Sequence, residues 1–157
     1  MKKLLFVVLM LLSAAPAHAD RAFQVGADLV VPYQMNAPKG RLTLLGGGHG
    51  EVFLNNATSV TLSVLFGLED TAPADRPFYL TPGVSFYLPF PILNPYIHAD
   101  LPILMNNGKD IGIQAGAGVL WNIILGLGIK YSIDVAYYFD SEAKIVNWAN
   151  VSAVFTF

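Results

Sequence analysis

Apolar residues alternate with polar or small residues along nearly the whole chain after residue 22, and this period of two is typical of β-strands. Short groups of asparagine, proline, glycine and charged residues, which are typical of turns, separate eight such segments. The predicted strands span residues 23–31, 41–54, 60–69, 78–88, 96–103, 111–121, 127–137 and 150–157. No segment of useful length has the period of a helix, so folds built from βαβ units are excluded.

The ionisable residues of these segments all lie opposite the apolar face of their strand. They are Asp28, Arg41, His49, Glu51, His98, Asp100, Lys130 and Asp134. A soluble sandwich or barrel turns its apolar face inward, whereas a membrane barrel has a polar lumen and an apolar outer band. Because both signs of charge occur in the set, and 54% of the chain is hydrophobic, we expect an all-β fold, an eight-stranded antiparallel up-and-down transmembrane β-barrel.

Aromatic residues gather toward both ends of the predicted strands, as in the two aromatic girdles of membrane barrels. The outer group is Tyr33, Phe66, Phe78, Tyr137, Tyr138 and Phe139, and the inner group is Phe53, Phe86, Phe90, Trp121, Phe155 and Phe157. Several glycines are expected on the lumen side, among them Gly26, Gly83, Gly116 and Gly118. They could leave a narrow gap, or let bulky neighbours such as Tyr96 interdigitate, and the sequence favours neither.

The first nineteen residues have the three parts of a secretory signal peptide. Lys2 and Lys3 precede an apolar stretch from Leu4 to Leu12, and residues 17–19 form the small-x-small cleavage pattern Ala-His-Ala. We therefore expect a signal peptide at 1–19, removed after Sec-type export, and one barrel domain at 20–157. A membrane anchor is the alternative, but the apolar stretch is short and the cleavage pattern follows it at once.

The composition excludes several other classes of protein. Beyond the leader, no run reaches the roughly 18 uncharged apolar residues that a membrane-spanning helix needs. The absence of cysteine excludes a disulfide scaffold, a cysteine metal site and a thiol-anchored lipoprotein. Seven basic and eleven acidic residues follow residue 19, a net charge of −4, so nucleic acid is not an expected partner.

The chain resembles the small outer-membrane β-barrel proteins of Gram-negative bacteria, of the eight-stranded OmpA/OmpX-like kind. The residues that carry the resemblance are the leader, the eight segments, the glycine-alternating run 113–119 and the terminal run 151–157. It implies a monomer in the outer membrane, surrounded by lipid and lipopolysaccharide, with Phe155 and Phe157 as the assembly signal for the insertion machinery. Pro82, Pro95 and Pro102 depart from the pattern, and we expect bulges or strand ends there.

Two histidines could take part in catalysis, because each has a carboxylate two residues away on the same strand face. The pairs are His49 with Glu51 and His98 with Asp100. Some outer-membrane barrels are lipid A deacylases or acyltransferases in which a histidine activates a serine or water. No serine follows either histidine in a recognisable motif, and both pairs are expected to face the lumen rather than lipid. The sequence therefore favours a lumenal ion and hydrogen-bond network.

Cofactors and metals are not expected. The same four residues have the ligand types of a metal site, but their spacing does not support one.

The glycine-rich stretch 46–50 lacks the lysine and the following helix of a phosphate-binding loop, so we expect a bend or close backbone approach within a strand.

Eight strands enclose a lumen that side chains fill, so a general diffusion pore is not expected. The sequence favours a non-enzymatic structural or surface-interaction protein. The alternatives are a narrow channel or small-ligand transporter, a lipid A-modifying enzyme, and a soluble periplasmic lipid-binding barrel. No binding motif names a ligand.

Overall fold

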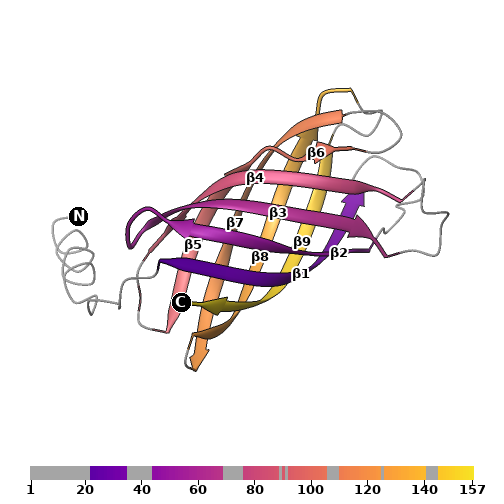
Figure 1. Cartoon of the computed structure of the whole chain (residues 1–157). Coiled ribbons are helices and arrows are strands. Elements are labelled where there is room, and N and C mark those ends of the chain that lie inside the picture. The colour runs from indigo at the N-terminus through magenta and orange to yellow at the C-terminus, as the bar shows by residue number, and fades with distance from the viewer. Residues whose placement is uncertain are drawn as a thin grey trace, which may run out of the picture.

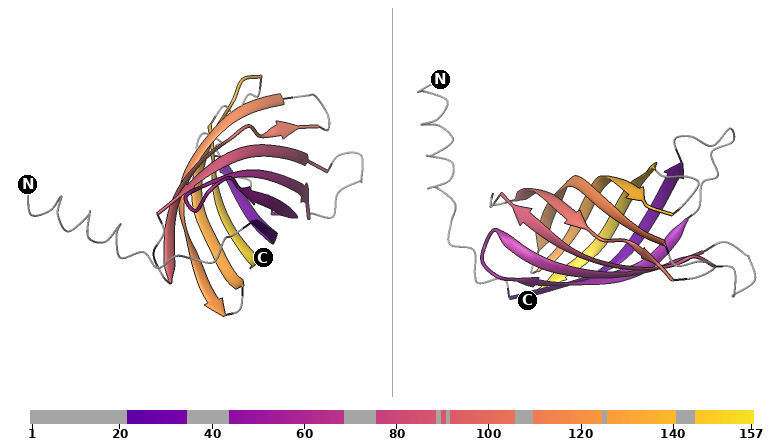
Figure 2. Two further views of the ribbon diagram at one scale, coloured as in Figure 1. Left: turned by 60° about the vertical axis from the view of Figure 1, so that its left-hand side comes forward. Right: turned by 90° about the horizontal axis from the view of Figure 1, so that it is seen from above.

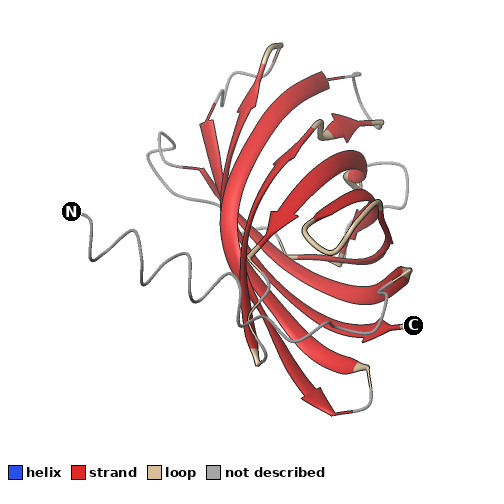
Figure 3. Cartoon of the chain, turned by 90° about the vertical axis from the view of Figure 1, so that its left-hand side faces the viewer, coloured by secondary structure: helices blue, strands red, loops and turns tan. Residues whose placement is uncertain are grey.

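The computed structural model describes residues 22–34, 44–68, 76–88, 90, 92–105, 110–124, 126–140 and 145–157. All regular elements in these ranges are β-strands (Figure 1, Figure 3). The strands are β1 (Phe23–Gln34), β2 (Leu45–Phe53), β3 (Thr58–Gly67), β4 (Phe78–Tyr87), β5 (Leu93–Asp100), β6 (Ile103–Leu104), β7 (Asp110–Ile124), β8 (Leu127–Tyr138) and β9 (Ile145–Thr156). Within the described ranges, no helix is long and apolar enough to cross a membrane. The predicted signal peptide lies outside them.

The strands form one closed antiparallel barrel. Neighbours in the sheet are also neighbours along the chain, and β1 pairs with β9 over eleven residues, from Gln24 with Thr156 to Gln34 with Val146. Figure 2 shows the strands wrapping around a common axis, strongly tilted against it. Closure gives every strand two partners, which satisfies its backbone groups without water.

Strands β5 and β6 are two parts of a single barrel strand, so the barrel is eight-stranded, as the sequence predicts. On β4, Gly83 pairs with Asp100 before the interruption and Leu80 pairs with Ile103 after it, without a shift of register. The interruption falls at Leu101 and Pro102. Pro102 has no N–H to donate, but its carbonyl still accepts a bond of 2.9 Å from the Gly112 amide.

The other two prolines do not behave as expected. Pro82 lies inside β4 opposite Leu62, and Pro95 lies inside β5 opposite Val119, so the expected bulge or strand end is wrong at both positions. Each proline still accepts a backbone bond of 2.8 Å, Pro82 from Leu101 and Pro95 from Leu88. The bond to its carbonyl keeps each proline in register with the neighbouring strand. Proline has no N–H, so the backbone bond that this group would donate is missing.

The outer face of the barrel is apolar and the lumen is polar. Strand β8 shows the alternation most regularly, because exposed and buried residues follow one another along its whole length. Its exposed side chains include Ile129 and Ile133, whereas Lys130, Ser132 and Asp134 are buried. Burial of the charged set and exposure of the aliphatic set is the inverse of a soluble protein, as predicted.

Exposed aromatic side chains occur toward both ends of the barrel. Phe66, Tyr137 and Phe139 are exposed toward one end, and Phe86, Trp121, Phe155 and Phe157 toward the other. The expectation is wrong for Tyr138 and Phe53, which are buried in the lumen. Each is an aromatic residue at a position where the alternation of its strand points inward. The position along the strand, and not the residue type, therefore decides the direction of the side chain. The side chain of Tyr33 lies outside the description.

Candidate functional site

Two clusters of buried side chains lie in the lumen at two levels. The loop-end cluster, near the longer connections between strands, consists of Val30, Leu45, Leu65, Ala136, Tyr138, Val146 and Trp148, with Tyr79 packed against it. The turn-end cluster, near the short turns, consists of Phe53, Tyr87, Tyr96, Leu120 and Val154. Both draw residues from at least five strands, so side chains from around the barrel meet on its axis.

Aromatic rings form the centre of each cluster. In the loop-end cluster, the ring of Tyr79 lies 5.3 Å from Trp148 and 6.4 Å from Tyr138. In the turn-end cluster, Tyr87 lies 5.1 Å from Tyr96 and 5.6 Å from Phe53. These centroid distances are those of directly packed rings, so aromatic contacts hold each cluster together.

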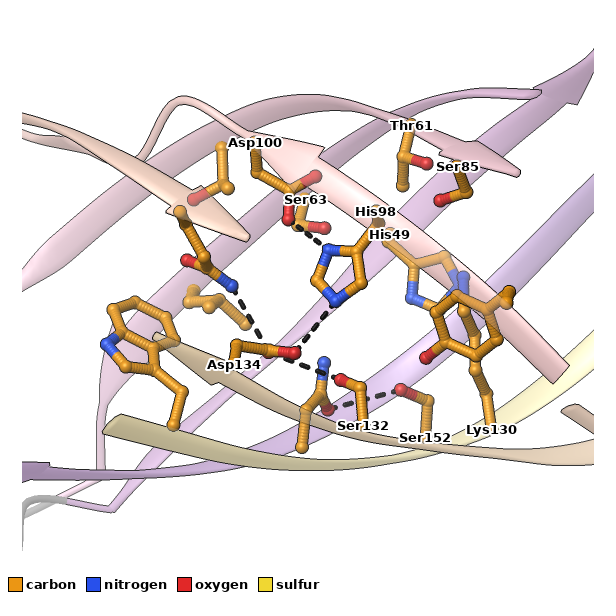
Figure 4. A pocket seen from close by; sticks show the side chains of 16 residues that line it. His49, Thr61, Ser63, Ser85, His98, Asp100, Lys130, Ser132, Asp134 and Ser152 are labelled. Carbon is orange, nitrogen blue, oxygen red and sulfur yellow. Dashed lines mark hydrogen bonds and ion pairs between the residues drawn. The ribbon is translucent and has the colours of Figure 1, made fainter. Parts of the chain in front are cut away.

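A polar chamber of about 50 Å³ lies along the lumen between these levels (Figure 4). Its walls include His49, His98, Gln114, Lys130 and Asp134, with serine and threonine hydroxyls between them. The chamber therefore collects most of the ionisable residues that the sequence placed opposite the apolar face. Arg41, which the sequence also placed on the lumen face, lies outside the described residues.

His98 stands between two carboxylates (Figure 4). Its Nδ1 bonds to Asp100, and its Nε2 lies 2.7 Å from Asp134 Oδ1. The second oxygen of Asp134 accepts bonds of 3.1 Å from the Gln114 amide and 3.2 Å from the Ser132 hydroxyl. An ionised carboxylate only accepts hydrogen bonds, so with both carboxylates ionised both nitrogens of His98 carry protons. Neither nitrogen then remains to take a proton from a nucleophile.

Glu51 and Lys130 form an ion pair across the barrel at the turn-end cluster. Lys130 Nζ lies 3.1 Å from Glu51 Oε2, and Tyr87 donates a bond of 2.7 Å to Glu51 Oε1, which also accepts from Ser59. The ammonium also lies 4.7 Å from the centroid of the Tyr96 ring, within the range of a cation–π contact. These hydrogen bonds and the ion pair offset the cost of burying the two charges.

His49 pairs with Asp28 and not with Glu51, which corrects the pairing suggested by the sequence. His49 Nδ1 lies 2.7 Å from Asp28 Oδ1 on the neighbouring strand β1. The reason is the register, because His49 pairs with Gly26, and its ring covers the space where a side chain of Gly26 would be. The other expected pair, His98 with Asp100, does form.

The lumen glycines make room for bulky side chains on the next strand. Asp100 lies over Gly83, and Tyr96 lies over Gly118, in each case its direct cross-strand partner. The glycines thus let bulky neighbours interdigitate, which is one of the two alternatives that the sequence left open.

Comparison with known proteins gave matches among solved structures only, since no protein family and no curated protein matches the sequence. Neisserial surface protein A (NspA) has a TM-score of 0.70 at 12% identity, over 89% of this chain and 100% of that chain. The N-terminal β-barrel domain of Pseudomonas aeruginosa OprF has a TM-score of 0.62 at 17% identity, over 87% and 100%. Ail, the attachment invasion locus protein of Yersinia pestis, has a TM-score of 0.57 at 12% identity, over 89% and 99%.

The fold is that of the small outer-membrane β-barrels. At these identities the likeness concerns the fold alone. It agrees with the resemblance noted in the sequence, which rests on different observations, namely the alternation and the terminal aromatic run.

The last strand ends where the barrel closes. The Phe157 amide donates a bond of 2.8 Å to the Phe23 carbonyl, and the two rings stack at 6.1 Å. The Phe155 ring lies 4.7 Å from that of Phe157, and both are exposed on the outer face. The two residues predicted as the assembly signal thus form one exposed aromatic group with Phe23.

Several lumen residues were not predicted as members of the network. Gln24 donates a bond of 2.8 Å to Thr156, and Ser59, Tyr87 and Gln114 bind the carboxylates described above. All of them are polar residues on the lumen side of their strands, so the alternation already contained the signal. Among the described residues, no group of three or more His, Asp or Glu is arranged to hold a metal ion.

Proposed function

We propose that this chain is an integral outer-membrane protein with a structural or surface-interaction role, without enzymatic activity and without a conducting pore. The observation that supports the proposal is the combination of an apolar outer face with two clusters of packed side chains in the lumen. The apolar face requires a hydrocarbon environment, and the packed side chains oppose a continuous aqueous path.

The orientation and the partners belong to the same proposal. The connections at the end with the C-terminus comprise residues 54–57, 88–92 and 125–126, and those at the other end include the longer ranges 35–44 and 68–77 (Figure 1). Outer-membrane barrels have short periplasmic turns and longer extracellular loops, so we place both termini in the periplasm. The chain is then exported by its leader, inserted through recognition of its C-terminal aromatics, and surrounded as a monomer by lipid and lipopolysaccharide.

A surface role is supported by the length of the outer connections and by two of the similar barrels. One of those is named a surface protein and the other an attachment invasion locus protein. The partner at the surface is not specified by any described residue.

The alternative of a lipid A-modifying enzyme has little support from the geometry. His98 has both ring nitrogens engaged by carboxylates, and His49 lies in the lumen, away from the lipid face. A soluble lipid-binding barrel requires an apolar interior, whereas this lumen contains a polar chamber and three groups of paired ionisable side chains.

Two measurements test the proposal. Cell fractionation with electrophoresis before and after boiling should place the chain in the outer membrane and show a faster-migrating folded form. Purified barrel in planar lipid bilayers should show no stable conductance. A soluble periplasmic fraction contradicts the membrane assignment, and steady single-channel currents support the narrow-channel alternative instead.

A further inference from the structure

A groove of about 320 Å³ lies on the outer face of the barrel, over the consecutive strands β4, β5 and β7. Phe86, Leu88 and Ile97 border it with large, exposed side chains. Ala117 pairs with Ile97 across the two strands and offers only a methyl group beside it. The outer wall is therefore hollowed where one strand presents a small residue next to large ones.

The floor of the groove is the sheet itself. Tyr96 and Gly118 line the groove, although both lie on the lumen side of their strands. The ring of Tyr96 packs against Tyr87 inside the barrel, and a Cβ atom at Gly118 would point toward that same Tyr96 ring. At these two positions the outer surface is thus formed by backbone, and the compact ring of Pro95 lies beside them.

No exposed polar atom of the described residues lines the groove. The carbonyl of Pro95 accepts a bond of 2.8 Å from the Leu88 amide, and the carbonyl of Leu88 accepts one of 3.0 Å from the Phe90 amide. The polar backbone groups at this place are therefore bound within the protein. A ligand that needs hydrogen bonds or counter-charges finds no partner here, so the occupant is a hydrocarbon.

A second copy of the chain fits the groove poorly. Stable protein interfaces use about 20 to 30 residues on each side, whereas the groove is lined by seven. A two-fold symmetric contact would also place the hollow opposite itself and enclose a void. The groove is instead continuous with the apolar outer face, which the surrounding lipid already covers.

The size of the groove suits part of one lipid chain. A cavity of about 150 Å³ lined by aliphatic and aromatic side chains holds benzene, so a groove of about 320 Å³ suits about twelve carbons of an acyl chain. Chains that pass straight over the groove leave it empty, and atoms that line a void lose their dispersion contacts. A chain that enters the groove restores these contacts, and packing of this kind drives association within membranes.

We propose that this groove is a binding site for one acyl chain of a phospholipid. The inference rests on the proposed function, which places the turn end of the barrel toward the periplasm, where the outer-membrane leaflet consists of phospholipids. Among the described residues of the turn-end connections, which are 54–57, 88, 90, 92 and 126, no side chain is charged. The site therefore selects the chain and not the headgroup.

Photo-cross-linking of the wild-type barrel in phospholipid vesicles tests the proposal. The probe is phosphatidylglycerol with a diazirine in the middle of one acyl chain, and tandem mass spectrometry locates the adducts. Leu88 borders the groove and is 40% exposed, whereas Leu127, at the same end of the barrel but outside the groove, is 51% exposed. Exposure alone gives more labelling at Leu127, and a retained chain gives more at Leu88.

We expect the excess at Leu88 with this probe and equally with a phosphatidylethanolamine probe. Labelling that follows exposure, or an excess that depends on the headgroup, overturns the proposal. The electrophoretic shift on boiling is recorded for the same vesicles. A chain that does not insert contradicts the proposed function, whereas an inserted barrel without the excess contradicts the groove alone.

A variant that fills the groove provides the second test. Ala117→Phe places a ring in the hollow and should abolish the excess at Leu88. Ala149→Phe is the matched control, because Ala117 and Ala149 pair with Ile133 from its two sides and only Ala117 lines the groove. An excess that survives Ala117→Phe, an equal loss in both variants, or a cross-linked dimer at Leu88 overturns the proposal.

Discussion

His98 Nε2 and Asp134 Oδ1 lie 2.7 Å apart, although their strands β5 and β8 are not neighbours in the barrel. Strand β7 runs between them, and its residue Gly116 pairs with His98 on one side and with Asp134 on the other. A Cβ atom at Gly116 would lie 2.5 Å from His98 Nε2 and would also overlap the Asp134 carboxylate. The ion pair therefore spans a whole strand because the residue beneath it has no side chain.

Replacement of Gly116 by alanine should destabilise the barrel. The added methyl group must displace His98 or Asp134 and weaken their bond, and overpacking of this kind costs about 1 to 3 kcal/mol. Gly50→Ala is the control, because a Cβ there meets only the Phe23 ring at 3.8 Å, an ordinary contact. We expect the control to stay within about 0.5 kcal/mol of wild type in urea unfolding. Equal stability of both variants would show that the strand-spanning pair contributes little.

Removal of Lys130 should leave Glu51 as an uncompensated charge in the lumen. Lys130→Met is therefore expected to lower the free energy of unfolding by about 3 to 5 kcal/mol. The double variant Lys130→Met with Glu51→Gln should recover part of this loss, since no net charge is then buried. Both are measured by reversible unfolding in detergent or lipid.

An outer-face residue of the same strand supplies the control for the two faces. Ile133 lies halfway along β8 and is exposed on the outer face, and a lysine on the lipid face near the midplane costs roughly 2 to 4 kcal/mol. Ile133→Lys should thus also destabilise, but no substitution in the lumen should rescue it. If both single variants unfold like wild type, the assignment of faces is incorrect.

The residues that the sequence predicted well, and those that it did not, differ in one physical respect. Strand β8 alternates polar or small lumen residues with apolar outer residues, so its faces follow from the sequence alone and its predicted end differs by one residue from Tyr138. Strand β9 begins at Ile145, five residues before the predicted start, and there Val146 and Trp148 turn apolar side chains into the loop-end cluster. There apolar residues lie on the lumen face and polar Asn147 lies on the opposite face, so the period of two no longer marks the faces in the sequence.

Partner choice within the lumen could not be predicted for a related reason. The sequence shows which residues share a face, but not which residues lie opposite on the next strand. His49 thus looked like a partner of Glu51, whereas the register of β1 and β2 brings it to Asp28. The glycine Gly116 has no chemistry of its own to mark it, and its role is visible only once β5, β7 and β8 are placed together.

Neither lumenal histidine should affect lipid A. Cells that express His49→Ala or His98→Ala should have the same lipid A species by mass spectrometry as cells with the wild-type chain and cells without it. The reason is the position of both rings in the lumen, with His98 engaged at both nitrogens. An acylation pattern that depends on either histidine, in a variant that is still inserted, would contradict the non-enzymatic interpretation.

Deletion of Phe157 should reduce insertion in cells much more than spontaneous refolding into detergent, because only insertion in cells requires recognition of the C-terminal aromatic. The deletion also removes the ring contact with Phe23 and the backbone bonds that Phe157 makes with Phe23 and Ala22, and this loss acts on both routes. Phe23→Ala and Phe157→Ala separate the two effects, since both remove the Phe23–Phe157 stack, whereas only the second changes the chain end and also removes the contact with Phe155. We expect similar refolding yields for these two variants and a lower insertion yield for Phe157→Ala, measured by membrane fractionation and by heat-modifiability. Equal insertion yields of the two variants would mean that the Phe157 ring contributes to barrel closure alone. Near wild-type yields by both routes would count against a membrane barrel whose C-terminus is recognised by the insertion machinery.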